Sequence, residues 1–278
     1  MSGVEPGAAC AARDASGGGP AANGWREFGA SLEPYRSNPV WRRFCDRLHS
    51  EWLLECLRAG ATGLILKTDL FEEAVGEGVC SLLSKKCGRV LGIDVSAAIA
   101  YEAARGGGVA AACADVRRLP FPDGSLDAVV SISTLDHFDS ESDIRRSIQE
   151  IHRVLRPGGR LLITLDNPRN WAVAARNALP HPVRTRTGLV PYFVGKTLSL
   201  SDLCALLEDC GYEVNQKTTL MHCPRVLAIP LARLCGSNAA GARARLLAAA
   251  LRGFERLRPS PVAERTGHFV AVCAVRRA

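Results

Sequence analysis

Apolar residues along this chain follow two spacings, one typical of helices and the other typical of buried strands. Over residues 39–58 they recur every three or four positions, which predicts an amphipathic helix. Continuously apolar runs then predict buried strands at 63–66, 89–93, 109–113, 126–132 and 161–165. Helical spacing separates these runs, at 72–83, 97–105 and 142–155. The alternation predicts a doubly wound, Rossmann-like α/β domain with a mainly parallel sheet covered by helices on both faces.

Polar residues stand where these predicted strands end. They are Asp69, Asp94, Asp115, the stretch 133–137, and residues 166–167. Ligands of doubly wound sheets bind outside the carboxyl ends of the strands, so we expect a site at this edge. Asp94 can accept both hydroxyls of a ribose, or it can be a capping or solvated residue. Asp115 can accept from an adenine amine, or it can be a turn residue.

Three segments carry a resemblance to a known family. GIDVS at 92–96, ADVRRLPFPDGSLDAVVS at 114–131 and IHRVLRPGGRLLIT at 151–164 occur in this order. Together they resemble the class I S-adenosylmethionine-dependent methyltransferases, specifically the type 11 small-molecule branch. The resemblance is strong over residues 60–166, and it implies a seven-stranded sheet whose last strand is antiparallel and follows a helical insertion. It also suggests a helix at 201–210 and the final strands at 212–218 and 267–275.

The resemblance implies S-adenosyl-L-methionine as the methyl donor and assigns roles at the strand ends. Asp94 would bind the ribose and Asp115 the adenine amine, with Val95 and Val116 beside the adenine ring. Ser133, after the fourth strand, joins the expected cofactor residues.

The first loop, ILKTDLFEEAVGEG, departs from the family pattern, which is an acid followed by three glycines at alternate positions. Lys67 stands nearest the usual acid, Asp69 comes two residues later, and the glycines, beginning with Gly76, are displaced. We interpret the loop as rebuilt, with Asp69 binding the cofactor ammonium and Thr68 assisting. The alternative is a catalytically silent binding protein that keeps the fold and has lost the donor.

The end of the fourth strand places Asp136 and His137 where the reactive end of the donor is expected. His137 suits removal of a proton from the acceptor, and Asp136 would orient it or bind substrate. The alternative for His137 is a packing role.

A polar stretch after the fifth strand is expected to line the acceptor pocket. Its candidate residues are Asp166, Asn167, Asn170, Trp171 and Tyr192. Alternatively, Asp166 and Asn167 cap the helix that follows. We expect O-methylation of a small, apolar metabolite, with nitrogen and carbon as less favoured acceptors.

Charge is unevenly placed along the chain. The net charge is +7, and residues 221–278 carry ten Arg and two Glu, so the preceding residues carry about −1. Within the insertion at 221–262, a basic amphipathic helix is predicted over 239–258. It can contact an anionic membrane, cover an apolar substrate, or pack on the domain with a solvated arginine face.

Other function classes find less support in the sequence. No G-x-G-x-x-G follows the first strand, which disfavours a nicotinamide-dependent oxidoreductase. The basic residues are not interleaved with stacking aromatics, so no nucleic-acid partner is expected. His222 and Cys223 lack partners at metal-ligand spacing, so no metal is expected.

Composition sets the expected organisation. No apolar run approaches the roughly 20 residues of a transmembrane helix, and the start lacks a secretory pattern. The eleven cysteines are odd in number and irregularly spaced, which favours a reducing, cytoplasmic setting. We expect a disordered leader at 1–24 and one domain at 25–278. Within this domain, the cofactor half is expected at 60–166, a lid and substrate region at 167–200, and the helical insertion at 221–262.

Overall fold

The computed structural model describes residues 32, 36–57, 63–106, 108–179 and 195–278. The predicted leader at 1–24 and the candidate substrate residue Tyr192 lie outside the described residues.

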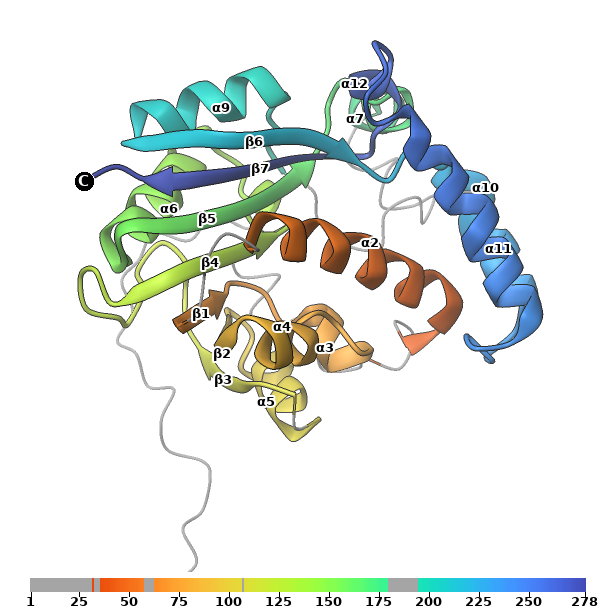
Figure 1. The fold of residues 1–278 in the computed structure, drawn as a ribbon, viewed down its shortest axis with the longest axis horizontal. Coiled ribbons are helices and arrows are strands. Elements are labelled where there is room, and N and C mark those ends of the chain that lie inside the picture. The colour runs from red at the N-terminus through yellow and green to blue at the C-terminus, as the bar shows by residue number, and fades with distance from the viewer. Residues whose placement is uncertain (1–31, 33–35, 58–62, 107, 180–194) are drawn as a thin grey trace, which may run out of the picture.

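The described residues form one seven-stranded sheet with strand order β3-β2-β1-β4-β5-β7-β6 (Figure 1). Its strands are β1 Gly63–Lys67, β2 Gly88–Asp94, β3 Ala110–Cys113, β4 Leu126–Ile132, β5 Leu155–Asp166, β6 Tyr212–Leu220 and β7 Phe269–Arg276. The first five strands pair in parallel, whereas β7 runs antiparallel to both of its neighbours. The predicted fold class is confirmed, and the strand order reverses between β1 and β4.

Helices cover both faces of the sheet. In chain order they are α2 Pro39–Leu57, α3 Phe71–Val75, α4 Cys80–Lys86, α5 Ala97–Arg105, α6 Glu141–Val154, α7 Trp171–Ala178, α9 Leu200–Asp209, α10 Arg225–Leu234, α11 Ala242–Gly253 and α12 Ala263–Thr266, with 3₁₀ turns η2 Leu135–His137 and η3 Phe254–Leu257. Successive strand residues point to opposite faces, so β5 sends Leu162 into the core beneath α2 and Leu161 into the core beneath α6 and α9. The sheet therefore separates two apolar cores.

The helix predicted at 72–83 is wrong, because the structure breaks it into α3 and α4. Gly78 turns the chain between them at φ +58°, a backbone region that favours glycine. The Glu73 carboxylate occupies the space beside Gly78 and accepts from the backbone N–H groups of Val79 and Cys80. A side chain thus caps the start of α4 from the preceding helix.

The insertion also differs from the prediction. The helix expected at 239–258 begins only at Ala242, and its last turn, Phe254–Leu257, is 3₁₀. A second helix, α10, precedes it although Pro230 lies inside that helix. Among the described residues, no helix has both the length and the apolar character needed to cross a bilayer.

Candidate functional site

The reversal of strand order brings the tips of β1 and β4 together. The hydroxyls of Thr68 and Thr134 are 3.1 Å apart, and Thr68 N donates to the Val130 carbonyl. Ser133 follows β4 with a left-handed φ of 47°, and its hydroxyl is buried without a hydrogen-bond partner among the described residues. Two of the predicted cofactor residues, Thr68 and Ser133, therefore lie at the ends of adjacent strands.

Asp94 is buried at the tip of β2 and is held by the backbone. Its two oxygens accept from Leu70 N at 3.0 Å and Ser96 N at 2.8 Å. Burial, together with the neighbouring carboxylate of Asp69, raises the pKa of Asp94 to about 7. Each carboxylate oxygen has a second lone pair, so both can still accept a ligand hydroxyl. The structure brings Asp69 close enough to Asp94 to disfavour ionisation of the Asp94 carboxyl.

The loop after β1 is closed by an ion pair rather than by a glycine turn. Lys67 Nζ lies 2.9 Å from Glu73 Oε2, with both side chains almost fully buried, and it also donates to the Asp69 carbonyl. Burial acts to lower the pKa of Lys67, but Glu73 and Asp69 outweigh this effect and raise it. Leu70 then packs directly against Gly92. A Cβ added to Gly92 would lie only 2.4 Å from Leu70 Cδ2. The rebuilt loop is thus packed down onto β2.

Within the first loop, Gly76 comes only after α3. It ends α3, its N–H donates to the Glu72 carbonyl, and it borders a surface pocket with Arg36, Glu102 and Arg105. The placement differs from the expectation that Gly76 approaches the cofactor beside Asp69, because the α3 helix carries the chain away before the glycine is reached.

Asp115 is paired with a side chain of its own loop. Arg117 reaches its carboxylate through Nε and Nη2, the latter at 2.7 Å, and also reaches Asp143 at 3.2 Å. Next to it Val116 is buried, and Val95 accepts from the Cys113 thiol through its carbonyl. An adenine amine at Asp115 would therefore have to share the carboxylate with a guanidinium.

The two catalytic candidates occupy η2, just after β4. Asp136 is buried, and one carboxylate oxygen accepts from Asp166 N at 2.9 Å, while the other has no partner within the described part of the chain. Burial raises the pKa of Asp136 to about 6. His137 is half-buried and lies near enough to Asp69 to favour ionisation of that carboxylate. Asp136 and His137 thus face the same acidic edge.

The candidate acceptor residues are strongly engaged within the protein. Asp166 lies 2.6 Å from Arg176 and 3.3 Å from His268; burial acts to raise its pKa, but these partners hold it below the ordinary value. Asn167 donates to the Glu264 and Gly267 carbonyls. These bonds join the β5 tip to α12 and the start of β7.

Asn170 caps α7, so it is this residue, rather than Asp166 or Asn167, that begins the helix. Its side-chain oxygen accepts from Ala172 N and Val173 N, and its amide donates to the Thr266 carbonyl. Trp171 is 66% exposed, which leaves its indole available at the edge of this region.

Sequence reasoning missed a group of basic side chains and aromatic rings beside Asp166. Arg225 bonds to His268 and lies over the rings of Trp41 and Phe269, at 5.7 Å and 5.9 Å. Burial and Arg225 lower the pKa of His268 to about 4. His49 lies 5.4 Å from Phe269, and its pKa is also lowered to about 4 by burial and by Lys67. A histidine before a strand carries no signal of these contacts, because its partners are distant along the chain.

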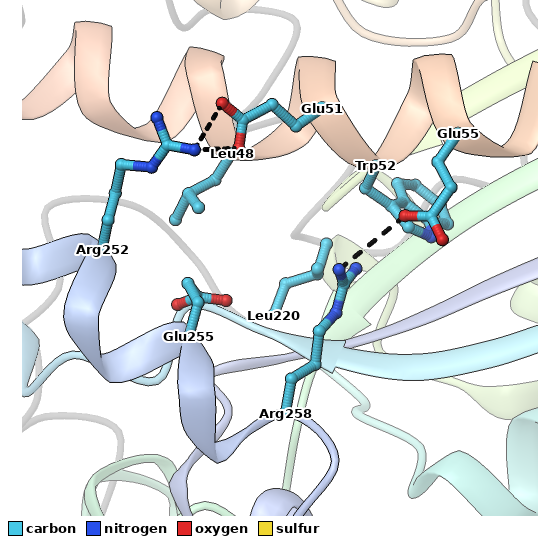
Figure 2. Close-up of a pocket in the computed structure, with 8 residues that line it drawn as sticks. All are labelled: Leu48, Glu51, Trp52, Glu55, Leu220, Arg252, Glu255 and Arg258. Atoms are coloured by element: carbon cyan, nitrogen blue, oxygen red, sulfur yellow. Dashed lines mark hydrogen bonds and ion pairs between the residues drawn. The ribbon is translucent and has the colours of Figure 1, made fainter.

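A separate pocket of about 340 Å³ lies between α2 and the α11–η3 segment (Figure 2). Its lining comprises Leu48, Glu51, Trp52, Glu55, Leu220, Arg252, Glu255 and Arg258. Glu51 pairs with Arg252 at 2.9 Å, and Glu55 lies 3.9 Å from Arg258. The pocket is beside the end of β6, four strand positions from β1, or about 19 Å away in the sheet. Its ion pairs join the insertion to α2.

Comparisons with known proteins agree with this architecture. A methyltransferase domain family matches residues 74–163. The chain is 30% identical over 156 residues to a probable S-adenosylmethionine-dependent methyltransferase of Mycolicibacterium smegmatis, covering 55% of each protein. It is 31% identical over 141 residues to a probable tRNA methyltransferase 9B of Bos taurus, covering 48% of this chain and 29% of that protein. The chain thus spans about half or less of the length of these curated relatives.

Solved structures resemble the fold over most of the chain. A [4+2]-cyclase, SpnF, superposes with a TM-score of 0.56 at 22% identity, covering 91% of this chain and 86% of that one. A geranyl diphosphate methyltransferase in complex with GPP and sinefungin gives a TM-score of 0.52 at 16% identity, covering 82% and 76%. At these identities the likeness concerns the fold alone.

Proposed function

We propose that this chain, which carries a methyltransferase domain in the class I S-adenosylmethionine-dependent methyltransferase fold, moves a methyl group from S-adenosyl-L-methionine to an oxygen of a small, apolar metabolite. The domain match and the fold confirm the family resemblance seen in the sequence. The reaction and its acceptor are the proposal.

The observation that carries the proposal is the pair of carboxylates at the tips of β1 and β2, of which Asp94 is buried and Asp69 is partly buried. Asp69 and Asp94 each have a raised pKa, caused first by burial; repulsion from Asp69 adds to the shift of Asp94, and repulsion from Glu73 adds to that of Asp69. A ligand with positive charge relieves this repulsion. When bound, S-adenosylmethionine supplies an electrophilic methyl group on a positively charged sulfur. Asp94 would hold its ribose hydroxyls and Asp69 its ammonium, so the residues present fit the donor.

The remaining cofactor residues would complete the donor site. Ser133 has a buried hydroxyl with no partner among the described residues, and Thr68 lies across the strand reversal, where its hydroxyl contacts that of the neighbouring Thr134. Val95 and Val116 supply apolar surface near Asp115. Gly76, at the end of α3, is not part of the proposed donor site.

On the acceptor side, an oxygen nucleophile must lose its proton as it is methylated. We assign this proton to His137, since a positioned imidazole typically contributes about 10²–10⁴-fold in rate. Asp136, fixed by Asp166 N, keeps one carboxylate oxygen without a partner among the described residues and would orient the acceptor hydroxyl. Trp171 would supply apolar surface for an apolar acceptor, beside Asp166, Asn167 and Asn170.

The basic residues of the chain are not interleaved with stacking aromatics, which favours a small acceptor over nucleic acid. The partial similarity to a probable tRNA methyltransferase makes RNA the alternative acceptor to be tested.

Calorimetry with S-adenosylmethionine and its demethylated product tests donor binding. We expect micromolar affinity for the unmodified chain, weakened about a hundredfold or more in Asp94→Asn, because two charge-assisted hydrogen bonds are lost. Asp209→Asn, an exposed carboxylate on α9, is the matched control and should bind normally. Absence of binding at millimolar donor would instead support a silent binding protein.

A labelled-methyl assay on fractionated cell extract tests the acceptor. Label in an extractable, alkali-stable small molecule is the expected result for an ether product. Label in the RNA fraction would refute the small-molecule assignment while leaving donor binding intact.

A further inference from the structure

Large exposed apolar side chains gather on the insertion. We define the insertion hairpin as residues 225–258, which comprise α10, α11 and η3. Of the nine large apolar side chains exposed within the described residues, six belong to it: Val226, Leu227, Leu231, Leu234, Leu246 and Phe254. Contiguous exposed apolar surface on a folded protein marks a site of contact with a partner or a membrane.

The α10 helix has two distinct apolar stripes. Ala228 and Ala232 are buried in the core that α2 also joins. Leu227, Leu231 and Leu234, spaced at i, i+4 and i+7, are 61%, 46% and 77% exposed. They form one ladder on the outer side of the helix, because residues at these spacings share a helix face. Packing on the domain therefore explains the alanines and leaves the leucines without a contact surface.

The α11 helix continues this outer surface. It buries Ala244 and Leu251, whereas Leu246 is 75% exposed and Phe254, just after the helix, is 41% exposed. Figure 1 shows α10 and α11 side by side at one end of the molecule, beyond the carboxyl end of β6. The salt bridge between Glu51 and Arg252 fastens this hairpin to α2.

The charge of the hairpin identifies the kind of partner. Its sequence contains seven Arg, no Lys, no Asp and one Glu, a net charge of +6. Four of these arginines are exposed and form no ion pair with a described residue: Arg233, Arg243, Arg245 and Arg256. Guanidinium groups beside exposed leucines match an anionic bilayer, where charges meet lipid phosphates and aliphatic side chains enter the acyl boundary. Nucleic acid is less suited, because Phe254 is the single aromatic residue of the hairpin.

We propose that the insertion hairpin docks the protein on the surface of an anionic lipid bilayer. Arg225 begins α10 and bonds to His268 beside Asp166, so the hairpin is joined directly to the β5 and β7 ends of the sheet. Docking would turn the carboxyl edge of the sheet toward the membrane, where an apolar substrate dissolves. The proposal goes beyond the methyltransferase function and does not depend on donor binding.

Vesicle flotation with the full chain tests the docking. Vesicles of phosphatidylcholine containing phosphatidylglycerol should carry the protein upward, and vesicles of phosphatidylcholine alone should carry little. Arg243→Gln with Arg245→Gln should lower partitioning about thirtyfold, since each arginine near an anionic surface contributes about fivefold to the affinity. Leu231→Asn with Leu234→Asn should lower it at least about tenfold, because less apolar surface is removed from water.

Matched controls lie elsewhere on the surface. Arg89→Gln removes an exposed arginine at the start of β2, in the opposite half of the sheet, and Tyr101→Asn removes a 62% exposed ring on α5. Neither change should alter flotation, and circular dichroism should show every variant folded.

Three flotation results would overturn the proposal. They are equal flotation with neutral and anionic vesicles, no flotation at all, and equal losses in hairpin and control variants. Binding of tRNA that needs the arginines but not the leucines would reassign the hairpin to nucleic acid and would also overturn it. None of these results bears on donor affinity, which calorimetry measures separately.

Discussion

Replacing Asp94 by asparagine removes a buried negative charge and should change how stability depends on pH. The pKa of Asp94 is raised from 3.8 to about 7 in the folded chain, first by burial and then by Asp69. Between these two values the folded state binds more protons than the unfolded state, so stability falls as pH rises. From pH 5 to pH 8 this one carboxyl lowers the free energy of unfolding by about 3 kcal/mol. Asparagine has no charge to bury, so this decline disappears in the variant.

The absolute stability of Asp94→Asn contains a second effect. In the unmodified chain, the two oxygens of Asp94 accept from Leu70 N and Ser96 N. The asparagine amide has one oxygen and one NH₂ group, so one of these two backbone donors loses its acceptor. This loss costs about 1–3 kcal/mol of stability at every pH. The informative quantity is therefore the difference between variant and unmodified chain as a function of pH. We expect this difference to shift in favour of the variant by about 3 kcal/mol between pH 5 and pH 8.

Urea unfolding at pH 5, 6, 7 and 8 measures this difference. Asp209→Asn, which changes an exposed carboxylate, should give a flat difference across the series. Adding S-adenosylmethionine should reduce the decline of the unmodified chain, because a bound cation favours the ionised carboxylates. If the stability difference between Asp94→Asn and the unmodified chain is instead equally flat across the series, the Asp94 carboxylate is already ionised at pH 5. That result would refute the argument that burial disfavours charge in the donor site.

Two further changes test the rebuilt loop. Lys67→Met should destabilise the fold by about 3–5 kcal/mol in urea unfolding, because it leaves the buried Glu73 charge unpaired. The double variant Lys67→Met with Glu73→Gln should recover most of this loss, and no recovery would show that the ion pair does not hold the loop. Gly92→Ala should lower the free energy of unfolding by about 1–3 kcal/mol, because the added methyl group overlaps Leu70. The control Gly108→Ala, whose added Cβ meets nothing within 4 Å, should change the unfolding midpoint little. Equal effects of the two changes would refute the packing argument.

The first four strands were predictable because each is centred on an apolar run with polar residues at its ends. Predicted and observed boundaries of the first four strands differ by one residue at most, and β4 agrees at both ends. A strand buried on both faces leaves this signal regardless of its partners.

Helices depended more on contacts that the local sequence does not reveal. The break between α3 and α4 follows from Glu73 capping α4, and that carboxylate is held in turn by Lys67. The α10 helix carries apolar residues on nearly every side, with Pro230 in its interior, so neither periodicity nor breaker residues favour a helix there.

The site was predictable to the extent that it lies at strand ends. Parallel strands end at one edge, so Asp69 and Asp94 could be expected to meet there. Arg225 and His268 could not be expected beside Asp166, because they approach from the insertion and from the segment before β7. Tertiary packing, rather than a motif, creates that part of the site.

The construction of the first loop has a consequence for how a donor would be recognised. A glycine-rich turn offers backbone N–H groups, which do not titrate, and it lets the ligand approach the main chain closely. In this chain Leu70 fills the space against Gly92, and the backbone N–H of Leu70 already donates to the Asp94 carboxylate. Recognition must then rest on carboxylates whose ionisation is suppressed by burial. Donor affinity should accordingly rise with pH up to about 7, where Asp94 becomes charged, and the ion pair of Lys67 with Glu73 replaces glycine as the element that fixes the loop.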